Sequence, residues 1–338
     1  MSIVPLGCPS ISSASSAREA AHPIPVGLSQ FRRLLRKLDV RYHDSLNGTE
    51  DSVQVFTQDI LQTSDISLAP MAPSRVSVRK VNTTRDISSA TSAARMNLSR
   101  IYLEVCVMSN PALTGHPNMS QLLGVTAIPP VGDSGDYHFG ILTNTTHGTL
   151  EDLLAVERKT SRDPRSYLIP WTEREDIAAQ CAEGLAALHD CNILHNDVQP
   201  ASFSVYITQT SPSTRVINVK LSNFAEAMPL TPYTILNDIP PANGQWCSIG
   251  PLANCTASPF CRDIHSFGLM VMYLSYYEFM SMEQTMEFLR TQKTFYDELG
   301  MHPALNTSLS LFNVVSKCCV NHGQQNLSMH WVAPTIRP

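Results

Sequence analysis

Residues Ile193 to Phe203 read Ile-Leu-His-Asn-Asp-Val-Gln-Pro-Ala-Ser-Phe and form the most informative segment of the chain. The run from Ile177 to His189 precedes it, with apolar residues repeating at the period of a helix. Pro200 follows Asp197 closely and rules out a continuing helix, so Asp197 is expected on a turn between a helix and a strand. A carboxylate held on such a turn is well placed to accept a proton or to orient a hydroxyl group.

This segment resembles the catalytic loop of the eukaryotic protein kinase family, which reads His-Arg-Asp-Leu-Lys-Pro-x-Asn. By that resemblance, Asp197 is the catalytic base, whereas Asn196 replaces the Arg that receives an activation-segment phosphate. Gln199 stands where the family has the Lys that neutralises the transferring phosphoryl group, and Ser202 stands where it has a metal-binding Asn. The predicted catalytic positions are Asp197, His195, Gln199 and Ser202. The loop therefore favours a kinase fold and argues against efficient phosphoryl transfer.

Segments before the loop fit the small lobe of the same family. Runs with the alternation of strands lie at 52–56 and 75–81. In the second run, the resemblance gives Arg79 the place of the phosphate-binding lysine, and a slip of one residue would give that place to Lys80. On a predicted amphipathic helix, Glu104 matches the Glu that pairs with this basic residue across a partly exposed contact. The alternative is that all three are solvated surface charges.

The next segments resemble the kinase hinge and the turn that precedes it. His116-Pro117-Asn118 and the following Leu-Leu-Gly-Val match the family's H-P-N and L-x-G pattern. A predicted strand at 137–143 ends at Thr143, the position that guards the back of the nucleotide pocket. Asn144 and Thr146 follow in the hinge and are predicted to line the nucleotide site with it.

A glycine-rich loop should precede the second strand, because backbone N–H groups cover the phosphates of the nucleotide there. Between Asn47 and Arg79 the sequence has a single glycine, Gly48. Bulky side chains would keep the backbone away from a phosphate group. This is evidence against ordinary ATP binding.

Two further motifs follow the loop. A predicted strand at 216–221 leads into Ser-Asn-Phe-Ala, where the family has the Asp-Phe-Gly whose Asp holds Mg²⁺. Asn223 keeps the shape of that Asp without its charge, and Phe224 is retained as a structural residue. Mg²⁺ prefers hard oxygen ligands that include carboxylates, so this position disfavours the metal. Later, Asp263 begins a segment similar to D-x-W-S-F-G; it either accepts hydrogen bonds from the catalytic-loop backbone, as in the family, or only caps the following helix.

Composition excludes several classes of protein. The chain has 338 residues, of which 43% are hydrophobic and 16% are charged, and its formal net charge is −5. This mild acidity gives no electrostatic footprint for nucleic acid. The longest apolar run, at 267–274, is too short to span a bilayer, and a secretory signal is not evident at the N-terminus. We therefore expect a cytoplasmic or nuclear protein without a transmembrane segment.

Nine cysteines without regular spacing indicate reduced and mostly buried thiols. Cys247, Cys255 and Cys261 lie close together in the sequence. Their spacing is not that of a zinc site, and no pair of histidines completes it. No metal is therefore assigned to them.

The motifs together predict an α+β, bilobal, protein kinase-like fold with a small β-rich N-lobe holding one main helix and a larger α-helical C-lobe. The basic helix that begins near residue 31 either packs on the domain or docks on a membrane surface, a partner or an import receptor. The predicted organisation is a disordered tail at 1–28, a basic amphipathic helix and linker at 29–50, the N-lobe and hinge at 51–146, the C-lobe at 147–322 and a C-terminal tail at 323–338.

The predicted function is that of a pseudokinase, a signalling scaffold or allosteric binding module with unidentified protein partners and at most weak nucleotide binding. The alternative is a weak or unconventional ATP-dependent protein kinase, specific for Ser/Thr or Tyr, that uses Asp197 as its base. ATP and Mg²⁺ are implied as cofactors only by this alternative, in which Glu226 could substitute as a metal ligand. A small-molecule phosphotransferase is the third possibility; such enzymes share the catalytic loop but lack the segment that begins at Asp263.

Overall fold

The computed structural model describes part of the chain and divides the whole of it into two compact units. The first unit comprises Met1–Gly115 and Ser120–Thr146, and the second comprises His116–Met119 and His147–Pro338. The predicted tail at 1–28 and the predicted basic helix at 31–38 lie outside the described residues. The described residues are 42–43, 54–57, 75–82, 92–128, 138–144, 146–160, 169–211, 214–230, 260–276, 314, 318 and 328–336.

The first unit contains a five-stranded sheet with the order β1-β4-β5-β3-β2. Its strands are β1 (Tyr42–His43), β2 (Gln54–Thr57), β3 (Arg75–Asn82), β4 (Leu122–Ile128) and β5 (His138–Asn144). Only the pairing of β1 with β4 is parallel among these described strands. The strands predicted from alternation at 75–81 and 137–143 are confirmed by β3 and β5. Strand β1 precedes residue 51, where the N-lobe was expected to begin.

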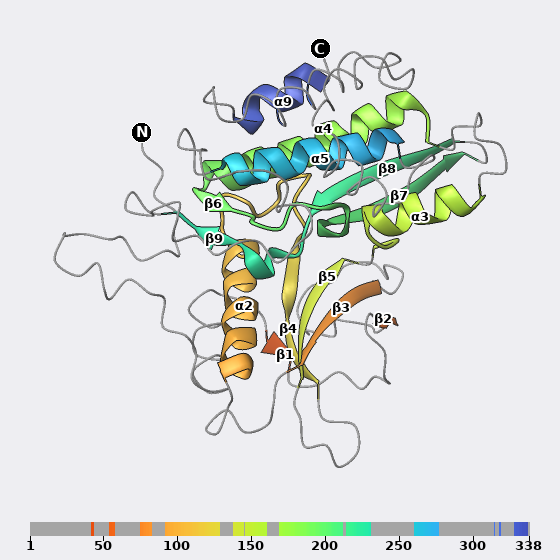
Figure 1. Ribbon diagram of the computed structural model, residues 1–338. Helices are drawn as coiled ribbons and strands as arrows, with labels where there is room; N and C mark the ends of the chain where they lie inside the picture. The colour runs from red at the N-terminus through yellow and green to blue at the C-terminus, as the bar shows by residue number, and fades with distance from the viewer. Residues whose placement is uncertain are drawn as a thin grey trace. The chain divides into compact units, whose positions relative to one another are not determined.

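Helix α2 (Ser92–Met108) contacts β3 in the same unit (Figure 1). Ile101, Val105 and Met108 are buried, which confirms the apolar face expected from their spacing. Glu104 shares this burial, with only 2% of its surface exposed. The expectation of a partly exposed Glu104 is therefore wrong, because the helix turns this position inward together with its apolar neighbours.

The second unit is built around α4. Its elements are α3 (Leu150–Thr160), α4 (Trp171–Asp190), β6 (Ile193–Leu194), η2 (Pro200–Ser202), β7 (Phe203–Ser211), β8 (Thr214–Leu221), η3 (Phe224–Glu226), β9 (Met228–Pro229), α5 (Cys261–Tyr276) and α9 (Met329–Ile336). Helix α4 packs against α5, β6, β8 and α9, and it lies beside α5 in Figure 1. Both helices and the strand at 216–221 were expected from sequence, and α4, α5 and β8 confirm them.

The segment 116–119 packs against α4 at Gly184 and is hydrogen-bonded to β8. The Asn118 side-chain amide donates to the Val219 carbonyl at 3.2 Å. The Asn118 carbonyl accepts the Leu221 N–H at 2.8 Å. A Cβ atom at Gly184 would lie 2.7 Å from that same carbonyl oxygen, so only glycine permits this close approach.

We expect Gly184→Ala to destabilise the protein by about 1–3 kcal/mol, because overpacking forces the backbone at Asn118 to shift. At an ordinary helical position the same change would be favourable by about 1 kcal/mol. The free energy of unfolding, measured by urea denaturation, distinguishes the two signs. A variant more stable than the parent protein would contradict the close packing of α4 against Asn118.

Arg174 is a fully buried charge near the start of α4. Its Nε donates to the Ile169 carbonyl at 2.9 Å. Its Nη1 lies 3.1 Å from the carbonyl of Ser275 and 3.4 Å from that of Leu274, at the C-terminal end of α5. The guanidinium group also lies 4.5 Å from the centre of the Trp171 ring. Arg174 thus joins the start of one core helix to the end of another.

Helix α9 lies in the segment that was expected to be a tail. Met329, Val332 and Ile336 are buried, and the helix packs on α4. At the surface, His330 Nε2 lies 2.6 Å from the Asp190 carboxylate. Within the described residues, no helix combines the length and the apolar character needed to cross a bilayer.

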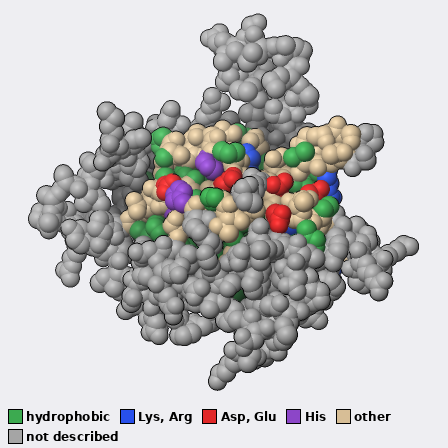
Figure 2. Space-filling view, turned by 90° about the horizontal axis from the view of Figure 1, so that it is seen from above, with side chains coloured by type: hydrophobic (Ala, Val, Ile, Leu, Met, Phe, Trp, Pro, Cys, Tyr) green, Lys and Arg blue, Asp and Glu red, His purple; other side chains and the backbone are tan. Residues whose placement is uncertain are grey.

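Figure 2 shows one face of the molecule in space-filling form. On its described part, acidic and histidine side chains lie among polar and apolar ones, and the Lys and Arg side chains do not merge into one patch. Nothing in the described part of this face therefore offers a continuous basic surface to a polyanion.

Candidate functional site

The loop after β6 carries the candidate site, and the whole of it lies in the second unit. Asn196 adopts a left-handed conformation with φ of 64°, which turns the chain sharply before Asp197. Asn tolerates this region better than most residues because its short polar side chain bonds locally. Pro200 then opens the short helix η2, which leads into β7. The expected turn at Asp197 is confirmed, but it lies between the short strand β6 and η2, so α4 does not directly precede it.

Asp263, on the first turn of α5, holds the backbone of this loop. One carboxylate oxygen accepts the His195 N–H at 2.7 Å, and the other accepts the Asn196 N–H at 2.8 Å. The imidazole Nε2 of His189, at the end of α4, lies 3.0 Å from the first of these oxygens. This is the arrangement that the resemblance implies for Asp263, with a histidine added to it.

Burial on its own would raise the pKa of Asp263, since the carboxylate is only 1% exposed. The hydrogen bond and charge of His189, the charge of His195 and the backbone N–H of His195 outweigh that effect. Together they bring the pKa below its ordinary value. The site therefore contains a buried carboxylate that is stabilised in its ionised form.

The two oxygens of the Asp197 carboxylate face two neutral amides. Gln199 Nε2 donates to one oxygen at 2.9 Å, and Asn223 Nδ2 donates to the other at 3.3 Å. Burial raises the pKa of Asp197, and nearby Glu226 and Asp263 add to the rise, whereas His195 and the Gln199 hydrogen bond oppose it. The Asp197 carboxylate is thus bonded by two amides, and its environment makes the charged form less favourable than it is in water.

The Ser202 side chain is turned inward. Its hydroxyl donates to the Asp197 carbonyl at 2.6 Å, and its own carbonyl accepts the Ser222 N–H at 2.9 Å. The residue is fully buried. Ser202 therefore connects the candidate loop to the end of β8, and its hydroxyl proton is donated to the loop backbone at the place where the resemblance would put a metal ligand.

His195 and Phe224 contact each other beneath the loop backbone, and His195 is hydrogen-bonded on both ring nitrogens. His195 Nε2 donates to the Ser222 carbonyl at 3.0 Å, and its Nδ1 accepts the Asp197 N–H at 3.3 Å. The edge of one ring meets the face of the other, with centroids 5.5 Å apart. Asn223 precedes Phe224 in a left-handed conformation, with φ of 60°. These contacts give His195 and Phe224 structural roles.

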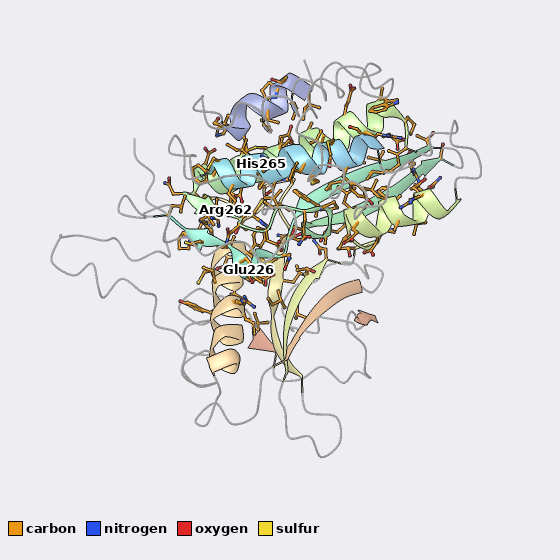
Figure 3. All side chains as sticks on the ribbon, in the orientation of Figure 1. Glu226, Arg262 and His265 are labelled. Carbon is orange, nitrogen blue, oxygen red and sulfur yellow. The ribbon has the colours of Figure 1, made fainter. Side chains whose placement is uncertain are left out.

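Arg262 was not singled out from the sequence. Its Nη1 donates to the side-chain carbonyl of Asn196 at 2.8 Å. Figure 3 shows Arg262 and His265 on α5 and Glu226 at η3. The position of Arg262 directly before Asp263 is the sequence signal that could have identified this residue. The role of His189 was also not predicted, although the sequence places this residue at the end of the predicted helix before the loop.

The predicted nucleotide-binding positions Arg79, Lys80, Glu104, Thr143, Asn144 and Thr146 belong to the first unit. The side chains of Arg79 and Lys80 lie outside the described residues, so their pairing with Glu104 stays a prediction. In the backbone, Thr143 lies opposite Ser77, and Asn144 lies opposite Val76. Asn223, the remaining predicted nucleotide contact, belongs to the second unit with the loop.

In the described part of the chain, no group of three or more His, Cys, Asp or Glu side chains could hold a metal ion. Cys247 and Cys255 lie outside that part. Cys261 is disulfide-bonded, so the expectation of a reduced thiol is wrong for this residue. Cys181 and Cys318 are buried thiols.

Neither the comparison with models of protein families nor the comparison with curated proteins finds a match for this chain.

Proposed function

We propose that this protein is a pseudokinase: a bilobal, protein kinase-like binding module that transfers phosphoryl groups poorly or not at all. It would act through protein partners as a scaffold or allosteric regulator. The order and spacing of the kinase-like motifs support the fold proposal. The second unit, with its loop after β6 and its helix α5, is compatible with the C-lobe of such a fold.

One observation carries the functional proposal. Both oxygens of the Asp197 carboxylate are engaged by neutral amides, Gln199 and Asn223, where the resemblance calls for a lysine and a metal-binding carboxylate. Phosphoryl transfer depends on positioning and on cations that stabilise the developing charge, and a single such element can be worth about 10³-fold in rate. A loop with amides at positions 199 and 223 lacks both the lysine charge and the metal-binding carboxylate.

A weak protein kinase is the second candidate, and the pKa of Asp197 favours it. Burial raises this pKa, which suits a carboxylate that accepts a proton from a hydroxyl group. Glu226 also acts electrostatically on Asp197, so a second carboxylate is near enough to influence the site. This candidate requires metal-dependent nucleotide binding.

Thermal unfolding with ATP, in the presence and absence of Mg²⁺, tests the proposal. A ligand at about 100 times its Kd stabilises a protein by about 2.7 kcal/mol, which corresponds to a melting shift of roughly 5–10 °C for a unit of this size. We expect no shift that depends on Mg²⁺. A shift without metal would be compatible with a binding module.

The matched control is Asp197→Asn, which keeps the shape of the side chain and removes its charge. A melting shift that requires Mg²⁺ in the parent protein would contradict the pseudokinase proposal, whether or not the shift persists in Asp197→Asn. Phosphoryl transfer to a peptide that is lost in the same variant would establish the kinase instead.

A further inference from the structure

Asn196 is held from two sides by adjacent residues of α5. Its backbone N–H donates to Asp263 Oδ1 at 2.8 Å, and its side-chain carbonyl accepts Arg262 Nη1 at 2.8 Å. The residue is buried. The first turn of α5 therefore fixes both the backbone and the side chain of the residue directly before Asp197.

Asn196 needs such support because it occupies the left-handed region, which L-residues other than glycine adopt at a cost. The two hydrogen bonds to Asp263 fix the N–H groups of His195 and Asn196. The peptide that follows Asn196 has one restraint of its own, because the Asp197 N–H donates to His195 Nδ1 at 3.3 Å. The side-chain bond to Arg262 adds a stronger restraint, because it holds the Asn196 side chain at a fixed place relative to α5.

We propose that Arg262 is the positioning residue of this loop: by bonding the Asn196 side chain, it keeps residue 196 left-handed and sets the direction in which Asp197 leaves the turn. Arg262 acts on this loop through its hydrogen bond to Asn196. Since the acceptor is a neutral amide, the loop is ordered by α5 itself and needs no bound anion or phosphoryl group. The proposal concerns the geometry of the loop and does not depend on whether the chain binds nucleotide.

A double-mutant cycle between Arg262→Ala and Asn196→Gly tests this role. Gly accepts the left-handed conformation and lacks the side-chain carbonyl, so Asn196→Gly removes the contact without adding strain. Arg262 also has contacts elsewhere, and the cycle separates those from the contact to Asn196. Arg262→Lys keeps a cation at the position and serves if Arg262→Ala fails to fold.

Amide hydrogen exchange at residue 196 is the first readout. We expect Arg262→Ala to accelerate it on the order of tenfold, the effect of losing one hydrogen bond to a charged donor. Exchange at Leu185, in the core of α4, should stay unchanged, which separates a local effect from global unfolding. In the Asn196→Gly background, Arg262→Ala should add nothing, and in the Asn196 parent Arg262→Lys should restore part of the protection.

The second readout is the pH titration of the Asp197 carboxyl carbon by NMR. A loosened loop admits water to this carboxylate, so its raised pKa should fall toward the ordinary value in Arg262→Ala. The proposal is overturned if Arg262→Ala has the same effect on residue 196 with and without the Asn196 side chain, or if the Asp197 titration does not move. Loss of loop protection in the parent protein after phosphatase treatment would also overturn it, because a phosphoryl group would then order the loop.

Discussion

Asp263→Asn should destabilise the protein by about 3–5 kcal/mol, the cost of breaking a buried charged network by removing one partner. The variant keeps the shape of the side chain but places an amide NH₂ group where a carboxylate oxygen accepts a hydrogen bond. His195 N–H, Asn196 N–H and the imidazole of His189 then compete for a single remaining acceptor. Urea denaturation measures the change in the free energy of unfolding.

The matched control is Asp190→Asn. Asp190 lies in an ion pair with His330 in which both side chains are largely exposed, so we expect a change within about 0.5 kcal/mol. A loss of less than about 1 kcal/mol in Asp263→Asn would mean that the loop backbone finds other acceptors.

The pH dependence of the Asp263→Asn effect has a definite sign. Because the pKa of Asp263 is lowered in the folded protein, its contribution is fully present above the ordinary carboxyl pKa of about 3.9. The contribution is lost as the pH falls below that value and through the folded pKa. The difference in unfolding free energy between parent and variant should therefore shrink on acidification through this range, and an unchanged difference would contradict the lowered pKa.

Arg174→Met should cost about 3 kcal/mol or more, because hydrogen bonds to charged groups are worth about 1.5–3 kcal/mol each and the buried carbonyls would remain without this donor. Met fills much of the volume of the arginine stem, so the effect isolates the lost guanidinium group. The carbonyls at Ser275 and Ile169 are the groups left behind. Urea denaturation gives the size of the loss, and hydrogen exchange at the end of α5 shows where it acts.

Two further variants calibrate the Arg174 result. Arg174→Lys keeps the charge but cannot reproduce the planar fork, so we expect an intermediate loss. Arg215→Met removes a more exposed guanidinium group, 2.8 Å from Glu157, and should cost no more than about 1 kcal/mol. Equal losses at positions 174 and 215 would show that burial of the Arg174 contacts is not the cause.

The elements that follow a clear periodicity were predictable from the sequence. The apolar spacing in α4 and the alternation in β3 leave one choice of secondary structure each. The break between helix and strand at the candidate loop followed from Pro200, because proline cannot continue a helix. These are local properties of the chain, and a single sequence contains them.

Other features depend on contacts between distant segments and could not be predicted. Glu104 was expected in a partly exposed pair, and its burial was not predictable because its sequence neighbours do not show what packs over it. Arg174 is buried because carbonyl groups about 100 residues away meet it. The bond between Arg262 and Asn196 likewise joins residues that are far apart in the chain. Helix α9 is short, and among the described elements it packs mainly on α4, which is distant from it in the sequence.

The segment 116–119 has a consequence for how the protein can be divided. It belongs to the second unit, yet it is synthesised within the first. A fragment that starts at His147 would lack Asn118. The Val219 carbonyl and the Leu221 N–H would then lose their hydrogen-bond partner, and Gly184 would lose its close neighbour. Such a fragment is therefore expected to be less stable than the second unit with residues 116–119 in place. During synthesis, Asn118 can make these contacts only after α4 and β8 have been synthesised.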